Sequence, residues 1–313
     1  MRRRGDRLDG FLVLDKPVGP TSTQALGRAR RALGAAKAGH CGTLDPLASG
    51  VLVIAFGEAT KLVDHVMDGA KRYAFAIRWG EARATDDAEG PVVATSPVRP
   101  DPAAIAAVLP RFLGTIRQVP PQFSAIKQAG RPAYARAREG EDFALPAREV
   151  RIDRLDLTAV AGPDEAWFEV DCGKGTYVRS LGRDIAAALG TCGHLSALRR
   201  LRVGGFGISE AISLESLEAP GYDPRASLRP IETALDDIPA LAVTGAEADA
   251  LRHGRAVQGP RAASMLSALP DGRAIAALAE GALVALVRAE GDIVKPLRVF
   301  NHLPPGGADT KET

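Results

Sequence analysis

The stretch Gly39-His40-Cys41-Gly42-Thr43-Leu44-Asp45-Pro46-Leu47-Ala48-Ser49-Gly50 separates a polar segment from the apolar run 51–56. Four of its twelve residues are glycine or proline, which is typical of a shaped loop. Asp45 precedes a proline, so its backbone is biased toward an extended conformation outside a helix. A carboxylate on such a loop, beside a buried strand, is placed like a catalytic group, although a turn-forming acid would explain the same residues.

The segments on either side of this loop predict a mixture of strands and helices. Tyr73, Phe75, Ile77 and Trp79 alternate with small or polar residues, which is the period of a half-buried strand. Further strands are predicted at the apolar runs 11–14, 51–56, 150–157 and 167–170. Helices are predicted over 23–35, 59–67, 102–112, 182–189 and 246–253, and the acidic, proline-punctuated segment 222–239 is predicted to be a linker.

Composition and charge place the chain among globular proteins with one large or two ordinary domains in 313 residues. Residues 211–313 carry 10 Lys and Arg against 14 Asp and Glu, and the first 210 residues carry 30 against 24. A basic first two-thirds suits a polyanionic partner, although many solvated surfaces are as basic. The first apolar run, 11–14, is too short for a signal core or a membrane span, and a cytoplasmic location is predicted.

Five motifs, in order along the chain, together resemble the TruB family, the bacterial tRNA pseudouridine-55 synthases. They are Lys16-Pro-x-Gly-x-Thr-Ser22, the loop from Gly39 through Gly57-Glu-Ala-Thr-Lys61, Lys71-x-Tyr73, Gly175-Thr-Tyr-Val-Arg-Ser-Leu181 and Leu198-Arg-Arg200. The resemblance covers about residues 11–300. Arg83 is a departure, because the family has threonine at this place in the loop 80–90.

The resemblance implies an α+β pseudouridine synthase fold, with a central mixed or antiparallel sheet flanked by helices and loops. It implies a catalytic domain over 1–235, with an RNA-gripping thumb at about 120–150. A small β-rich PUA-like RNA-binding domain would cover 236–301, and 302–313 would be a disordered tail.

The activity implied is isomerisation of uridine 55 in the T loop of tRNA to pseudouridine. The glycosidic bond breaks, the uracil rotates while held, and C5 bonds to C1′. No group is added and nothing is oxidised, so no cofactor and no metal is expected. The expected partner is the T arm of tRNA, bound by a monomer that needs neither a membrane nor a protein partner.

The resemblance also assigns catalytic residues. Breaking the bond builds positive charge on the ribose, and the carboxylate of Asp45 would stabilise it, either by attacking C1′ or by removing a proton from C2′. The planar guanidinium of Arg179 would keep that carboxylate ionised and oriented. Tyr73 and Leu198 would hold the uracil from its two faces after the base is flipped out.

A further set of residues is expected to bind RNA, mainly by contacts to phosphates, which position an RNA without reading its sequence. His40 would stabilise the reshaped T loop, although a satisfied loop histidine explains it equally well. The full set is His40, Lys16, Lys61, Arg131, Arg136, Arg138, Arg148, Tyr177 and Arg199.

Several other interpretations remain open or are disfavoured by spacing. Gly173-Lys-Gly-Thr176 suggests a phosphate loop but lacks the Walker spacing, and Cys192-Gly-His194 has no second pair of metal ligands. A glycosidase would need a second active acid near Asp45, which no motif supplies. A dyskerin-like synthase that uses a guide RNA, and a tRNA-folding chaperone that acts without catalysis, remain as alternatives.

Overall fold

The computed structural model describes residues 5–124, 126–128, 130–141, 143–236, 238–258, 274–290 and 293–301. Its main sheet has ten strands, in the order β14-β1-β3-β12-β4-β11-β10-β7, with β2 beside β3 and β13 beside β12. Most neighbours are antiparallel, but β1–β14 and β3–β12 are parallel, so the sheet is mixed as predicted. The strands are β1 (Gly10–Lys16), β2 (Ala38–His40), β3 (Ala48–Phe56), β4 (Lys71–Trp79), β7 (Gly114–Gln118), β10 (Arg148–Val160), β11 (Glu165–Cys172), β12 (Gly193–Val203), β13 (Phe206–Gly207) and β14 (Ile212–Ser213).

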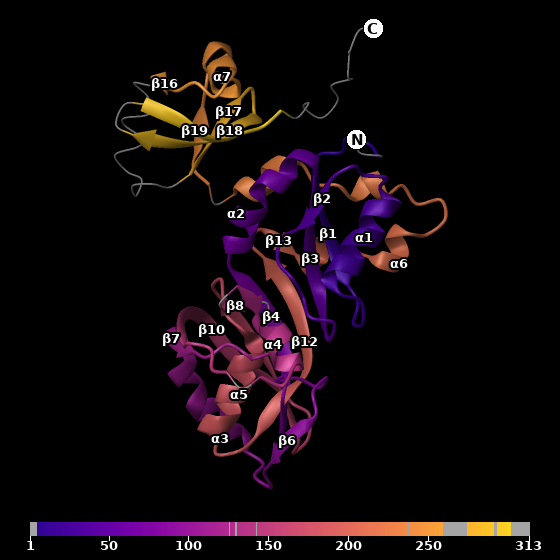
Figure 1. Ribbon diagram of the computed structural model, residues 1–313, viewed down its shortest axis with the longest axis vertical. Coiled ribbons are helices and arrows are strands. Elements are labelled where there is room, and N and C mark those ends of the chain that lie inside the picture. Colours follow the sequence, from indigo (N-terminus) through magenta and orange to yellow (C-terminus); the bar gives the residue numbers. More distant parts are fainter. Residues whose placement is uncertain are drawn as a thin grey trace.

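Strand β12 joins the two halves of this sheet, because it pairs with β3 on one side and β4 on the other. In Figure 1, β1–β3 with helix α1 (Ser22–Ala32) lie above, and β4, β7 and β10 with α3 (Pro102–Val108) and α5 (Val178–Ala188) lie below. Separate apolar cores fill the two halves, around Phe56 in one and Phe75 and Phe168 in the other. Side chains at the centre of β12 therefore stand between both halves.

Helices α1 and α3 begin at residues whose side chains cap them. The Thr21 hydroxyl accepts a hydrogen bond from the Gln24 N–H, and the Gln24 side chain accepts one from the Thr21 N–H, so a complete capping box starts α1. The Asp101 carboxylate caps α3 by accepting a hydrogen bond from the Ala104 N–H, with Pro102 at the first helical position. The helix predicted over 59–67 is instead a 3₁₀ turn, Gly57–Leu62, followed by α2 (Val63–Asp68), and both bury apolar side chains in a further cluster with Phe11 and Val53.

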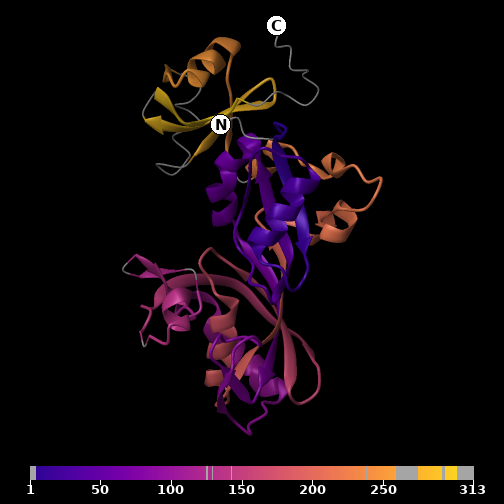
Figure 2. The same cartoon turned by 45° about the vertical axis from the view of Figure 1, so that its right-hand side comes forward.

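Two further parts complete the fold. A second sheet has the order β15-β17-β18-β19-β16, with helix α7 (Gly245–Arg252) against it, so the β-rich C-terminal part is confirmed. Its strands are β15 (Ala240–Ala242), β16 (Val257–Gln258), β17 (Ile275–Ala279), β18 (Ala282–Glu290) and β19 (Ile293–Val299). Figure 2 shows the segment with β8 (Lys127–Gln128), β9 (Arg131–Pro132) and α4 (Ala133–Arg138) standing away from the main sheet.

The predicted linker 222–239 is packed rather than free. Ile231 and Ala234 are buried in one apolar cluster with Phe206 of the main sheet and Phe300 after the second sheet. Prolines and acids suggested a linker, but apolar residues spaced three and four apart in this segment form a 3₁₀ turn that fills the junction. The residues expected to form a disordered tail, 302–313, lie outside the described part of the chain.

Within the described part of the chain, none of the helices has the length and apolarity needed to cross a membrane.

The parallel pairing of β3 with β12 explains why the central loop ends in glycine. Ala48 pairs with Leu198 and Gly50 with Arg200. Gly50 has φ of 97°, and a Cβ atom on it would lie 2.2 Å from the carbonyl oxygen of Arg200. Only glycine allows the two backbones to approach this closely at that φ. The loop is thereby fixed in register against β12.

We predict that Gly50→Ala lowers the free energy of unfolding by more than Gly114→Ala, measured by urea denaturation. Both glycines have positive φ, but a Cβ at Gly114 would meet nothing within 4 Å. Backbone strain alone should cost Gly114→Ala about 1 kcal/mol, and the added clash should bring Gly50→Ala to about 3 kcal/mol or more. Equal losses would show that β3 and β12 can separate without cost.

Candidate active site

Asp45 lies on the loop between β2 and β3, and Arg179 lies in the first turn of α5. Nη2 of Arg179 is 3.0 Å from Oδ2 of Asp45. The arginine side chain is only 6% exposed, whereas that of Asp45 is 43% exposed. A buried, fixed cation thus faces a carboxylate that a ligand can still reach.

Arg179 is held from several directions besides Asp45. Its Nη1 donates to the Thr85 carbonyl at 2.8 Å and lies 3.4 Å from Oδ2 of Asp87, and its Nη2 donates to the Phe123 carbonyl at 2.9 Å. Asp87 is only 2% exposed. One guanidinium therefore serves two carboxylates, and the sequence interpretation, which paired it with Asp45 alone, missed Asp87.

Arg200 fixes the backbone of the loop that carries Asp45. It is buried, and it donates to the carbonyls of Val51 at 2.7 Å, Thr43 at 3.1 Å and Gly42 at 3.2 Å. Sequence reasoning named its neighbours Leu198 and Arg199 but missed Arg200. Strand alternation was the available signal, because residues 198 and 200 of a strand share one face and 199 points to the other.

A cavity of about 330 Å³ opens beside the Asp45–Arg179 pair. Tyr73 on β4 and Leu198 on β12 line it from adjacent strands, and Arg148 and Tyr177 line it near α5. Burial raises the pKa of the Tyr73 phenol, so this ring stays neutral at physiological pH. The guanidinium carbon of Arg148 lies 4.8 Å from the centre of the Tyr177 ring.

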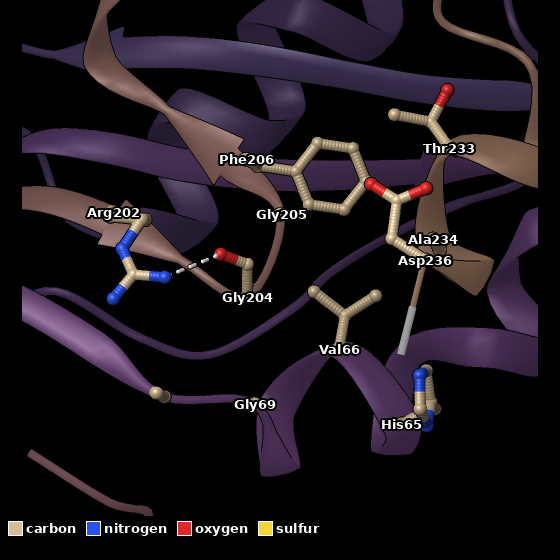
Figure 3. A pocket seen from close by; sticks show the side chains of 11 residues that line it. His65, Val66, Gly69, Arg202, Gly204, Gly205, Phe206, Thr233, Ala234 and Asp236 are labelled. Atoms are coloured by element: carbon tan, nitrogen blue, oxygen red, sulfur yellow. Dashed lines mark hydrogen bonds between the residues drawn. The ribbon is translucent and has the colours of Figure 1, made fainter. Parts of the chain in front are cut away.

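A second cavity, also of about 330 Å³, lies between α2, the β12–β13 turn and the 3₁₀ turn Ile231–Leu235. In Figure 3, Thr233 and Asp236 lie on one side of the Phe206 ring, and Arg202 on the other side donates to the Gly204 carbonyl. None of the residues predicted from the sequence to act in catalysis or RNA binding lines it. The four residues predicted to act in catalysis all line the first cavity.

Comparison with known proteins decides the family. Residues 30–178 match the TruB family pseudouridylate synthase N-terminal domain, and residues 179–236 match the tRNA pseudouridylate synthase B C-terminal domain. The chain belongs to the TruB family. It is therefore a pseudouridine synthase, an isomerase, as its five motifs predicted.

Relatives of this TruB-family chain match it almost from end to end. It is 52% identical to tRNA pseudouridine synthase B of Rhodospirillum rubrum, over 96% of this chain and 99% of that one. It is 51% identical to the protein of the same name from Caulobacter vibrioides, over 96% and 98%. Among solved structures, a chain of a Cbf5-Nop10-Gar1 complex has a TM-score of 0.72 at 27% identity, covering 93% of this chain and 84% of that chain.

Three of the residues predicted to bind RNA, Lys16, Arg199 and Lys61, make polar contacts within the protein itself. Lys16 is fully buried, and its Nζ donates to the carbonyls of Pro17 and Pro20 at 2.8 and 2.9 Å. Its ammonium group therefore organises the turn before α1 and is not presented to a phosphate. Arg199 is paired with Asp15 at 2.8 Å.

Lys61 connects the main sheet to the end of β19. Its Nζ donates to Glu58 at 2.6 Å and to the Val299 carbonyl at 2.7 Å, and lies 5.6 Å from the centre of the Phe300 ring. Glu58 also accepts a hydrogen bond from the Asn301 N–H at 2.8 Å. Lys61 thus links the two sheets, and the RNA contact predicted for it stays a prediction.

The arginines of the segment with β8, β9 and α4 differ in how far they are neutralised. Arg131 pairs with Glu139 and Glu141, and Arg136 pairs with Glu141. Arg138 lies over the ring of Tyr134 and pairs with none of the carboxylates that the structure describes. Of the three, Arg138 is therefore the one that presents an unneutralised charge.

His40 lies at the end of β2, at the start of the loop that carries Asp45, and does not line the cavity. Burial lowers the pKa of its imidazole, so the ring is neutral at physiological pH. Its buried Nδ1 has no hydrogen-bond partner within the described residues. The imidazole thus keeps one unused polar atom close to the loop.

We predict that Lys61→Ala lowers the free energy of unfolding by about 1–3 kcal/mol, because it leaves the half-buried Glu58 carboxylate with one fewer partner. Lys295→Ala is the control. It removes an exposed pair with Glu290 within the second sheet and should cost less than about 1 kcal/mol. Urea denaturation of both variants measures the difference, and equal losses would contradict the junction role.

This loss should depend on pH. Burial acts to raise the pKa of Glu58, but hydrogen bonds from Asn301 and Lys61 outweigh it and lower the pKa. A carboxyl whose pKa is lowered on folding contributes stability above its unfolded pKa and loses it as the pH falls through the folded value. The difference between wild type and Lys61→Ala should therefore shrink at acid pH.

Proposed function

We propose that this protein converts uridine 55 in the T loop of tRNA to pseudouridine, with Asp45 as the catalytic carboxylate. The relatives named tRNA pseudouridine synthase B support tRNA as the substrate. The observation that carries the catalytic assignment is the accessible Asp45 carboxylate, 3.0 Å from the buried Arg179 at the edge of a cavity.

The chemistry requires an ionised carboxylate beside the ribose. Positive charge grows on the sugar as the glycosidic bond breaks, and a fixed anion in a partly dehydrated cavity stabilises it more than water would. Asp45 supplies the anion, and Nη2 of Arg179 fixes one of its oxygens. Attack on C1′ and removal of the C2′ proton both need this carboxylate in the same place beside the sugar.

The released uracil must be held while it turns. Tyr73 and Leu198 come from neighbouring strands and line the same cavity, so they can contact the base from two sides. The cavity falls in the size range of small-ligand sites. Flipping the base out of a folded loop costs a few kcal/mol, which contacts elsewhere on the tRNA must supply.

Asp87 acts as a counterion that leaves Asp45 free for the substrate. An unpaired buried arginine would draw the Asp45 carboxylate entirely to itself. Asp87 and the Thr85 carbonyl contact Nη1, and Nη2 contacts Asp45 and the Phe123 carbonyl. The second oxygen of Asp45 is then available to the ribose.

Binding of the tRNA arm would use surfaces on both sides of the cavity. We assign the catalytic domain to 1–235, with the thumb at 120–150, and a PUA-like RNA-binding domain to 236–301. Arg148 and Tyr177 lie inside the cavity and would contact the target nucleotide. Arg138 on the thumb would contact a phosphate of the T arm.

The test maps pseudouridine in an unmodified tRNA transcript incubated with the protein alone, by carbodiimide labelling and primer extension. Wild type should give one new stop at position 55. Asp45→Asn should give none, while its affinity for tRNA stays within a few fold, because the substitution removes the charge and keeps the size of the side chain.

Other outcomes would change the conclusion. Modification at another position would keep the enzyme class and overturn the substrate site. Tight binding of tRNA by wild type without any modification would favour the tRNA-folding chaperone. A collapse of affinity in Asp45→Asn would show that the substitution damages the binding loop and would leave the catalytic assignment unsupported.

Binding of tRNA should weaken steeply with salt, because phosphate contacts release counterions. We predict that Arg138→Gln reduces the slope of log K against log salt by about one, as expected for one lost phosphate contact. Arg111→Gln, an exposed arginine beyond α3 and outside the thumb, is the control and should leave the slope unchanged. Filter binding between low and physiological salt measures both, and a flat response of wild type would contradict the thumb assignment.

A further inference from the structure

Two consecutive aspartates face two arginines that lie one helical turn apart on α5. Asp87 contacts Arg179, as described above, and Oδ2 of Asp86 lies 2.8 Å from Nη1 of Arg183. Residues i and i+4 of a helix share one face, so the turn 85–87 docks on that face through both ion pairs. The first pair includes the arginine that contacts Asp45, and the second pair lies one turn farther along the helix.

The turn depends on contacts outside itself to keep its shape. Asp86 has φ of 61°, a conformation that residues other than glycine rarely adopt and that persists only where the surroundings hold it. Its N–H donates to the Arg83 carbonyl, and its own carbonyl accepts from the Leu195 N–H, each at 3.0 Å. The Asp86 side chain is 15% exposed, so its pairing with Arg183 takes place mostly away from water.

Arg83 ties the ends of the same loop together. Its Nη1 lies 3.3 Å from the Ala88 carbonyl and 3.2 Å from the Gly90 carbonyl, and its Nη2 pairs with Glu81 at 2.9 Å. With the ends of the loop closed by Arg83, the position of its tip on α5 is set by Asp86 and Asp87. The residue that departs from the family pattern is thus part of the support for this tip.

We propose that Asp86 and Arg183 are positioning residues for the isomerisation. Their ion pair holds the turn 85–87 on α5, which keeps the Thr85 carbonyl and the Asp87 carboxylate on Nη1 of Arg179 and leaves Nη2 for Asp45. Neither residue lines the cavity, so both act through Arg179. The proposal rests on the proposed function, because it concerns the same reaction.

Loss of the pair should slow the chemical step more than it weakens tRNA binding. Without it the turn can shift, Nη1 of Arg179 loses its partners, and the guanidinium can rotate away from its position beside Asp45. A displacement of about 1 Å in a catalytic group can cost about 100-fold in rate. Burial already raises the pKa of Asp86, and Arg183 opposes that rise, so removal of Arg183 would also favour the uncharged acid.

Asp86→Asn is the sharper of the two possible substitutions. It keeps the size of the side chain, and Arg183 retains Asp184 at 3.0 Å and the Val119 carbonyl at 2.9 Å. Single-turnover pseudouridine formation, with protein in excess over tRNA, should fall about 10-fold or more. The Kd for tRNA, from filter binding, should stay within about threefold, since no phosphate-binding charge is lost.

If Asp86 had a purely structural role, Asp86→Asn would lower the rate of pseudouridine formation by the same factor whether or not Arg179 is present. We therefore compare Asp86→Asn in the wild-type and Arg179→Lys backgrounds. If Asp86 acts through Arg179, its substitution should change the rate by less than about twofold once the guanidinium is gone, because the two effects are coupled. Equal fold-losses in the two backgrounds would overturn the positioning role.

Control measurements separate the possible failures. Glu218→Gln removes a remote, exposed ion pair with Arg28 and should match wild type in rate and in thermal unfolding. If Asp86→Asn lowers the unfolding temperature, Arg183→Lys is compared with Arg183→Gln, and the retained charge should preserve more of the rate. If wild type is active and Asp86→Asn forms pseudouridine at the wild-type rate, only the positioning role is overturned. If wild type is inactive, the proposed function is overturned.

Discussion

The buried guanidinium of Arg179 is the group on which the arrangement of the site depends. A charge taken out of water is costly unless partners surround it, and this one draws them from segments far apart in the sequence. Asp45 comes from the loop before β3, Thr85 and Asp87 from the loop after β5 (Glu81–Arg83), and Phe123 from the segment between β7 and β8. Neutralising one arginine therefore brings three loops to the first turn of α5.

The second constraint is the close approach of β3 and β12. Gly50 lets the two backbones meet, and Arg200 on β12 then reaches back to three carbonyls around the Asp45 loop. The same strand carries Leu198 to the cavity. Because β12 also pairs with β4, its register against both neighbours sets the spacing between Leu198, Tyr73 and Asp45.

Much of the fold could be predicted from local pattern, and much of the site could not. Alternation identified β4, and hydroxyl and acidic caps identified the starts of α1 and α3, because these signals lie within a few residues. Asp87 and Arg200 were missed because their importance comes from partners about 90 and 150 residues away in sequence. The contacts that Lys16 and Lys61 make within the protein were likewise missed, because their partners cannot be read from the family motifs in which these lysines stand.

The ion pairs of the fold change the interpretation of the basic charge in the first 210 residues. The excess of basic residues in the first 210 positions suggested a broad phosphate-binding surface, yet many of these arginines are matched to carboxylates within the fold. Arg72 and Arg202 share Asp171, and Arg199 is paired with Asp15. Among the described residues, groups such as Arg138, which pairs with none of the described carboxylates, leave their charge unneutralised. The guanidinium of Arg179 beside Asp45 is itself balanced by Asp87, so these three side chains together carry no net positive charge.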